Sequence, residues 1–122
     1  MPERTPRIVA VLLVALVAAA CNPSLGQLNL RPDKYYQDTV KVKARVARIQ
    51  RLDGETLLEL EDQRHHRLLA RVQGPFEVGV DDWVKAKGVF VHDMRVGGTI
   101  LYDVLAVEDI STTGSPWLPV FD

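Results

Sequence analysis

The stretch TVKVKARV (residues 39–46) alternates between apolar and basic side chains from its second residue onward. One set is apolar and comprises Val40, Val42, Ala44 and Val46. The other set is basic and comprises Lys41, Lys43 and Arg45. Because successive side chains of a strand point to opposite faces, this period of two predicts a strand with one face in a core and the other in solvent.

Two more strands follow in the same pattern. The alternation slips after Val46, since Ile49 is the next large apolar residue, and such a slip predicts a bulge in a long bent strand. Asp53-Gly54 then provides a hairpin turn. Alternation resumes in TLLELED (residues 56–62) and in RLLARV (residues 67–72). These segments predict a meander of three antiparallel strands.

The second half of the chain predicts two further strands. Gly74-Pro75 interrupts the pattern before WVKAKGVFV (residues 83–91). A loop, HDMRVGG (residues 92–98), leads to a last strand, TILYDVLAVEDI (residues 99–110). This last strand is apolar on both faces, so we expect both faces to contact protein.

These five strands resemble the OB-fold barrel, which has a long, kinked first strand and a closing hairpin. The segment VGVDDWVKAKGVF (residues 78–90) is similar to the start of the fourth strand of such domains, in which a Val-Gly-Asp-type turn leads into the strand. The resemblance covers residues 39–110 and implies an all-β, small five-stranded barrel. Many OB-folds plug the barrel with a helix after the third strand, but this chain has room for about one turn there. We expect the tail to act as a lid through Trp117, Leu118 and Phe121.

The N-terminal segment predicts export. Residues 8–20 form an uncharged apolar run that is shorter than the roughly 20 residues a membrane-spanning helix needs. Arg4 and Arg7 precede this run, and alanines end it, as in an export signal. The single cysteine, Cys21, comes next, and Ala18-Ala-Ala-Cys21 resembles the lipobox of bacterial lipoproteins, which usually have leucine where Ala18 stands.

The resemblance to lipoproteins implies cleavage before Cys21 and acylation of this residue, whose several acyl chains would hold the protein on a membrane. Asn22 resembles the residue found there in lipoproteins sent to an outer membrane. Secretion with an incidental cysteine and an uncleaved membrane helix remain alternatives. The expected organisation is a signal peptide (1–20), a lipidated cysteine and tether (21–38), an OB-like barrel (39–110) and a C-terminal tail (111–122).

Composition and motifs favour a non-catalytic module. Without residues 1–20 the chain has 13 basic and 15 acidic residues. It therefore lacks the overall positive charge that is typical of proteins that bind nucleic acid. The chain has no nucleophile elbow, phosphate loop or zinc-ligand spacing. We therefore expect no enzymatic activity and no cofactor.

OB-folds often bind oligonucleotides or oligosaccharides across the second and third strands, so the outward basic residues of the third strand and of the neighbouring first strand are candidates for ligand contact. They are Lys41, Lys43, Arg45, Arg67 and Arg71. Glu59 and Glu61 are expected between them, and no outward aromatic ring is available for stacking on a base. The pattern therefore favours cross-strand ion pairs and at most weak oligonucleotide binding. Lys85 and Lys87 are expected on the strand beside Lys41 and Lys43.

His92 and Met94 form a second candidate site, because residues two apart share one strand face and imidazole with thioether suits copper(I) or silver(I). This pair resembles part of the ligand set of periplasmic copper and silver efflux chaperones, which use two methionines and a tryptophan, for which Trp83 is the candidate. His92-Asp93 also resembles the start of the haem-binding run of the haem chaperone of cytochrome c maturation. We interpret His65 and His66 as exposed histidines of a turn and not as metal ligands.

Together these features predict a lipid-anchored lipoprotein of the bacterial cell envelope, facing the periplasm or the exterior, with an outer membrane favoured over the inner one. Its barrel is expected to be a binding or assembly module, with an envelope protein as a possible partner. A metal or haem carrier using His92 is the alternative, and a weak oligonucleotide binder is the third.

Overall fold

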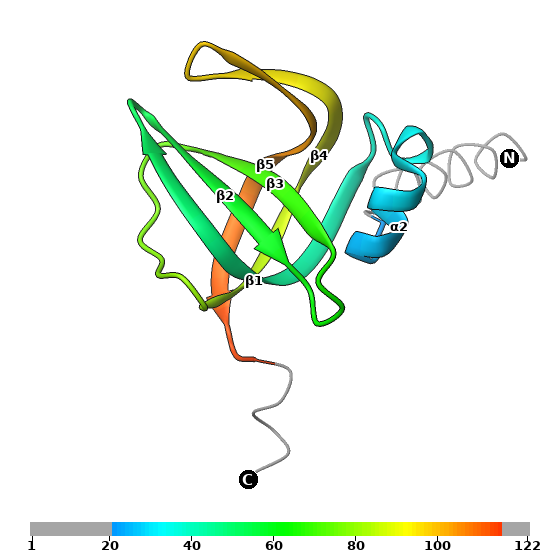
Figure 1. Cartoon of the computed structure of the whole chain (residues 1–122), viewed down its shortest axis with the longest axis horizontal. Coiled ribbons are helices and arrows are strands. Elements are labelled where there is room, and N and C mark those ends of the chain that lie inside the picture. The colour runs from blue at the N-terminus through cyan, green and yellow to red at the C-terminus, as the bar shows by residue number, and fades with distance from the viewer. Residues whose placement is uncertain (1–20, 116–122) are drawn as a thin grey trace, which may run out of the picture.

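The computed structural model describes residues 21–115 (Figure 1). Its strands are β1 (Thr39–Leu52), β2 (Glu55–Glu61), β3 (Arg67–Gln73), β4 (Trp83–Val96) and β5 (Thr99–Thr113). They close into a barrel in the order β1-β2-β3-β5-β4, in which only β3 and β5 run parallel. This is the strand order of an OB-fold, so the predicted all-β, five-stranded barrel is confirmed.

The predicted signal peptide (1–20) and the proposed lid residues Trp117, Leu118 and Phe121 lie outside the described residues. Between residues 21 and 115, the structure contains no helix that is both long and apolar enough to cross a membrane.

β1 is long because it pairs with two other strands. Its first half, Thr39–Arg45, pairs with β4, and its second half, from Arg45 to Leu52, pairs with β2. The register with β2 shifts between Val46 and Arg48, where the change of phase in the sequence predicts a bulge. The bulge lets one strand bend round the barrel and join both sides of it.

The hairpin of β4 and β5 is longer than the sequence predicts. Residues 92–98 are expected as a loop, but β4 continues to Val96 and β5 begins at Thr99. Gly97 and Gly98 have φ of 56° and 84°, so these two residues alone can make the turn. The prediction of a loop is therefore wrong, because residues 92–96 belong to β4 and only Gly97 and Gly98 form the turn.

Only part of β5 is covered on both faces. Val104 and Leu105 are buried, whereas Ile100 and Tyr102 are 48% and 60% exposed. Residues 104–107 pair with β3 as well as β4, but the outer part of the hairpin has β4 as its single neighbour. The expectation that both faces of the whole strand contact protein is therefore wrong for this outer part.

The segment predicted as a tether is partly folded onto the barrel. It contains helix α2 (Leu25–Leu30) and a 3₁₀ turn, η1 (Pro32–Lys34). A capping box at Ser24 starts α2, and Leu25 and Leu28 are buried in the barrel core. Asn29 Nδ2 donates a hydrogen bond of 2.8 Å to the carbonyl oxygen of Arg67, at the start of β3. The boundary of the domain therefore lies before α2 and not at Thr39.

The loop between β3 and β4 covers the opposite end of the barrel. Phe76 and Val78 pack against the core, and Arg51, near the end of β1, donates hydrogen bonds to both of their carbonyl oxygens at 3.1 and 3.4 Å. Helix α2 lies at the starts of β1 and β3, whereas this loop lies at their ends. The two segments together close the core.

A candidate anion-binding groove

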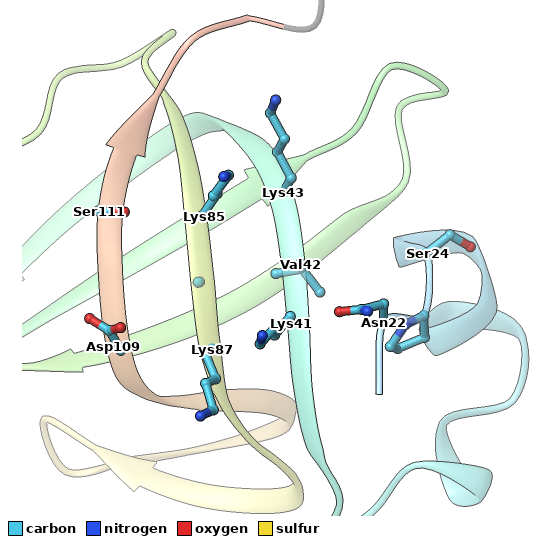
Figure 2. A pocket seen from close by; sticks show the side chains of 11 residues that line it. Asn22, Ser24, Lys41, Val42, Lys43, Lys85, Lys87, Asp109 and Ser111 are labelled. Atoms are coloured by element: carbon cyan, nitrogen blue, oxygen red, sulfur yellow. The ribbon is translucent and has the colours of Figure 1, made fainter. Parts of the chain in front are cut away.

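An open groove of about 740 Å³ crosses the outside of β1, β4 and β5 next to the segment that precedes α2 (Figure 2). It is lined by Asn22, Pro23, Ser24, Lys41, Val42, Lys43, Lys85, Ala86, Lys87, Asp109 and Ser111. In Figure 2 the four lysines come from β1 and β4, with Asp109 and Ser111 on β5 at one side and Asn22 at the other. We call this surface the lysine groove.

The alternation of buried and exposed side chains in β1 and β4 places the four lysines on the outside of the barrel. In β1 the side chains of Val40 and Val42 are buried while Lys41 and Lys43 are exposed. β4 repeats the arrangement from Val84 to Gly88, with both of its lysines exposed. The core that holds the barrel together thus also directs every one of these lysines to the outside.

The lysines face one another across the strands. Lys41 is the register partner of Lys87, and Lys43 is the partner of Lys85. Like charges directly opposite on antiparallel strands destabilise a sheet. Within residues 21–115, none of the four forms an ion pair. The chain contains five lysines, and only Lys34 lies outside the groove. The groove therefore holds four positive charges against one carboxylate, that of Asp109, the register partner of Lys87 on β5.

Cys21 lies at the edge of this surface. It is exposed and forms a parallel bridge with Val40. Its backbone N–H donates to the carbonyl oxygen of Thr39 at 3.0 Å, and its own carbonyl accepts from the N–H of Lys41 at 2.8 Å. Cys21 thus extends the sheet by one residue beside β1, next to the lysine groove.

The other predicted basic residues lie in a separate ion-pair network. Arg45 binds Glu61 and Asp81, and Arg67 binds Glu59 and Glu61. Glu61 is buried, and its hydrogen bond from Arg45, reinforced by the charge of Arg67, lowers the pKa of its carboxyl. The structure therefore divides the candidate ligand face into the lysine groove and a cross-strand ladder of the kind the sequence favours.

The two residues of the candidate metal pair have different partners, since Met94 contacts Arg71 and His92 contacts two tyrosines. Arg71 Nε donates to Met94 Sδ at 3.3 Å and lies 3.8 Å from a carboxylate oxygen of Glu55. The exposed ring of His92 contacts the rings of Tyr36 and Tyr102 edge-on. Among the described residues, no three His, Cys, Asp or Glu side chains gather as metal ligands. A metal site at His92 and Met94, or a haem site at His92, stays a prediction.

Tyr36, which is expected from the sequence to pack on the domain, contacts the core near His92. The Tyr36 hydroxyl donates to Asp103 Oδ1, and the Tyr36 ring stacks on Phe90 with centroids 5.5 Å apart. The hydrogen bond to Asp103 raises the pKa of Tyr36 to about 12. Tyr36 thereby fastens the segment after η1 to the β4–β5 hairpin.

The comparisons with known proteins bear on the fold alone. No protein family and no curated protein matches this chain. A solved structure from Leishmania major Friedlin, assigned as an aspartyl-tRNA synthetase, is similar over 78% of this chain with a TM-score of 0.59 and 17% sequence identity. The matched part is 21% of that much longer chain. At this level of identity the likeness supports an OB-like barrel.

Proposed function

We propose that this protein is a lipid-anchored lipoprotein of the bacterial cell envelope whose OB-like barrel is a non-catalytic module that binds an anionic ligand in the lysine groove. The observation that carries the proposal is the position of Cys21, which is exposed and bridged to β1 beside the groove. In this arrangement the residue proposed to be acylated lies at the edge of the sheet whose outer face forms the binding surface.

The lipobox-like sequence and the bridge support acylation together. An acylated amino terminus keeps one N–H, so the 3.0 Å hydrogen bond from the Cys21 nitrogen to Thr39 persists after the modification. The Cys21 side chain, which would carry the diacylglycerol, is exposed and free of a disulfide. Several acyl chains, each methylene contributing about 0.8 kcal/mol, give stable membrane binding that a single chain does not.

Metabolic labelling with radioactive palmitate tests the anchor. We expect the wild-type protein to incorporate label and to stay in the membrane pellet after a carbonate wash, and Cys21→Ser to lose both properties. A Cys21→Ser protein that resists the wash would show that an apolar helix holds the chain. Binding of polyphosphate by the detergent-solubilised protein tests the groove, and unchanged binding by Lys41→Glu/Lys85→Glu would contradict its role.

A further inference from the structure

We infer that the lysine groove docks on the anionic phospholipid headgroups of the same membrane that holds Cys21, so that the barrel lies on the bilayer with β1 and β4 towards it. This inference rests on the proposed acylation of Cys21. It names the anionic ligand of the groove and fixes the orientation of the domain, which an anchor on a flexible tether would leave free.

Cys21 is fastened directly to the barrel. Cys21 is hydrogen-bonded to Thr39 and Lys41 on β1, so the acylated residue cannot move away from the sheet without breaking both bonds. The segment after it, Asn22 to Ser24, lines the groove and leads directly into α2, whose leucines are in the core. The barrel is therefore held at the depth of the headgroups.

Cys21 also lies close to the lysines of the groove. Neighbouring strands lie about 5 Å apart, so Cys21 is about one strand spacing from β1 and about two from β4. Two spacings equal roughly one Debye length at an ionic strength of 0.1 M, about 10 Å. Lys41 and Lys87 lie one residue from the Val40–Gly88 row that Cys21 bridges, so an anchor at the level of the headgroups brings them within electrostatic range of lipid phosphates. Lys43 and Lys85 lie two residues further along the same strands and extend the charged surface away from the anchor.

The positive charge of the groove comes from lysines alone. Lys41, Lys43, Lys85 and Lys87 are opposed in like-charged pairs, which anions between the strands would relieve. Lysine is a compact charge on a flexible stem and suits a mobile array of phosphates, whereas the arginines Arg45 and Arg67 are fixed in ion pairs elsewhere. Asp109 is the one carboxylate among the groove-lining residues, so the groove stays cationic.

Amine footprinting of the full-length acylated protein tests the orientation. The protein is reconstituted in vesicles of phosphatidylcholine alone or of phosphatidylcholine mixed with phosphatidylglycerol, and lysine acetylation is followed by mass spectrometry. We expect the four groove lysines to react several-fold more slowly in the anionic vesicles. Lys34, which lies outside the groove, is the internal reference and should react equally in both.

Paired variants separate the docking surface from the fold. Lys41→Glu/Lys85→Glu turns each like-charged cross-strand pair into an opposite-charged pair, so the barrel should remain folded or gain stability. In this variant we expect Lys43 and Lys87 to lose their protection by anionic lipid. Arg64→Glu/Arg95→Glu makes the same change of charge at exposed residues outside the groove and should keep the protection.

The outcomes distinguish this inference from the proposed function. Palmitate label at Cys21 with equal lysine reactivity in both kinds of vesicle would overturn the docking and leave the anchor intact, whereas absence of label would remove the anchor. Protection by soluble polyphosphate or an oligonucleotide in neutral vesicles that equals the protection by anionic lipid would overturn the assignment to headgroups. Strong protection by anionic lipid alone would support it.

Discussion

At the scale of single residues, the barrel depends on a position, Gly88, that has no room for a side chain. A Cβ atom at Gly88 would lie 2.1 Å from the backbone oxygen of Ala106, at the point where the register of β4 and β5 shifts. Backbone atoms of a paired strand cannot move aside as the end of a side chain can. Glycine is therefore required here for close approach, and the adjacent shift in register depends on it.

We predict that Gly88→Ala lowers the free energy of unfolding by about 3 kcal/mol, the upper end of the usual range for overpacking. Urea unfolding followed by far-ultraviolet circular dichroism measures the effect. Gly79→Ala is the matched control, because a Cβ atom there would be in ordinary contact at 3.4 Å with Asp82. A variant at position 88 as stable as this control would show that β5 can shift to make room.

Glu61 should make stability depend on pH. Because its folded pKa lies below the unfolded value of 4.5, its contribution is present above that pH and is lost as pH falls through the folded pKa. We predict that Glu61→Gln is less stable than wild type at neutral pH and that the difference shrinks in acid. Urea midpoints over a pH series test this, with Glu77→Gln, at an exposed loop residue, as the control that should follow wild type.

At the scale of elements, α2 is held by the barrel and not by its own propensity. Six residues are too few for an independent helix in water, so its stability comes from the capping box and from burial of one face. That face consists of Leu25 and Leu28, whereas Leu30 is 80% exposed. The helix covers one end of the core, as the loop of Phe76 and Val78 covers the other.

We predict that Leu28→Ala lowers the free energy of unfolding by about 2–4 kcal/mol, as large-to-small changes in a core do. Leu30→Ala removes the same atoms from an exposed position in the same helix and should change it by less than about 0.5 kcal/mol. Chemical denaturation of both variants makes the comparison. Equal effects would mean that α2 detaches from the barrel in solution.

Sequence patterns predicted the elements whose signal is local. The alternation around Val42, the change of phase after Val46 and the Asp53-Gly54 turn each lie within one segment and fixed β1, β2 and their hairpin. Helix α2 was missed because two leucines three apart are its only periodic signal. The same limit applies to the site: alternation placed Lys41 and Lys43, but the position of Asp109 across the groove depends on pairing between distant strands.

At the scale of the whole molecule, charge is distributed unevenly. The formal net charge is −1 and the pI is about 6.3, yet four of the five lysines share one groove. The arginines of the ladder on β1 and β3 are balanced by neighbouring carboxylates. A weakly acidic protein therefore presents one cationic side to its surroundings, and local charge governs the encounter with a polyanion more than net charge does.

We predict that the protein, solubilised in neutral detergent, is retained by a cation exchanger at neutral pH and low salt despite its negative net charge. Lys41→Glu/Lys85→Glu should pass through the column, and Arg64→Glu/Arg95→Glu, with the same net charge, should still be retarded. Elution position against salt concentration is the measurement. Identical elution of the two variants would show that the lysines do not act as one patch.

The place of β5 in the barrel has a consequence for the order in which the chain can fold. β5 pairs with β3 through residues 104–107 and with β4 along most of its length, so the ring closes only when the last strand is present. Because the chain is synthesised from its N-terminus, the residues of α2 and β1 leave the ribosome long before their core partners Phe90 and Leu105. We expect such late closure to keep the nascent chain unfolded until β5 is present, which suits the export that the N-terminal segment predicts.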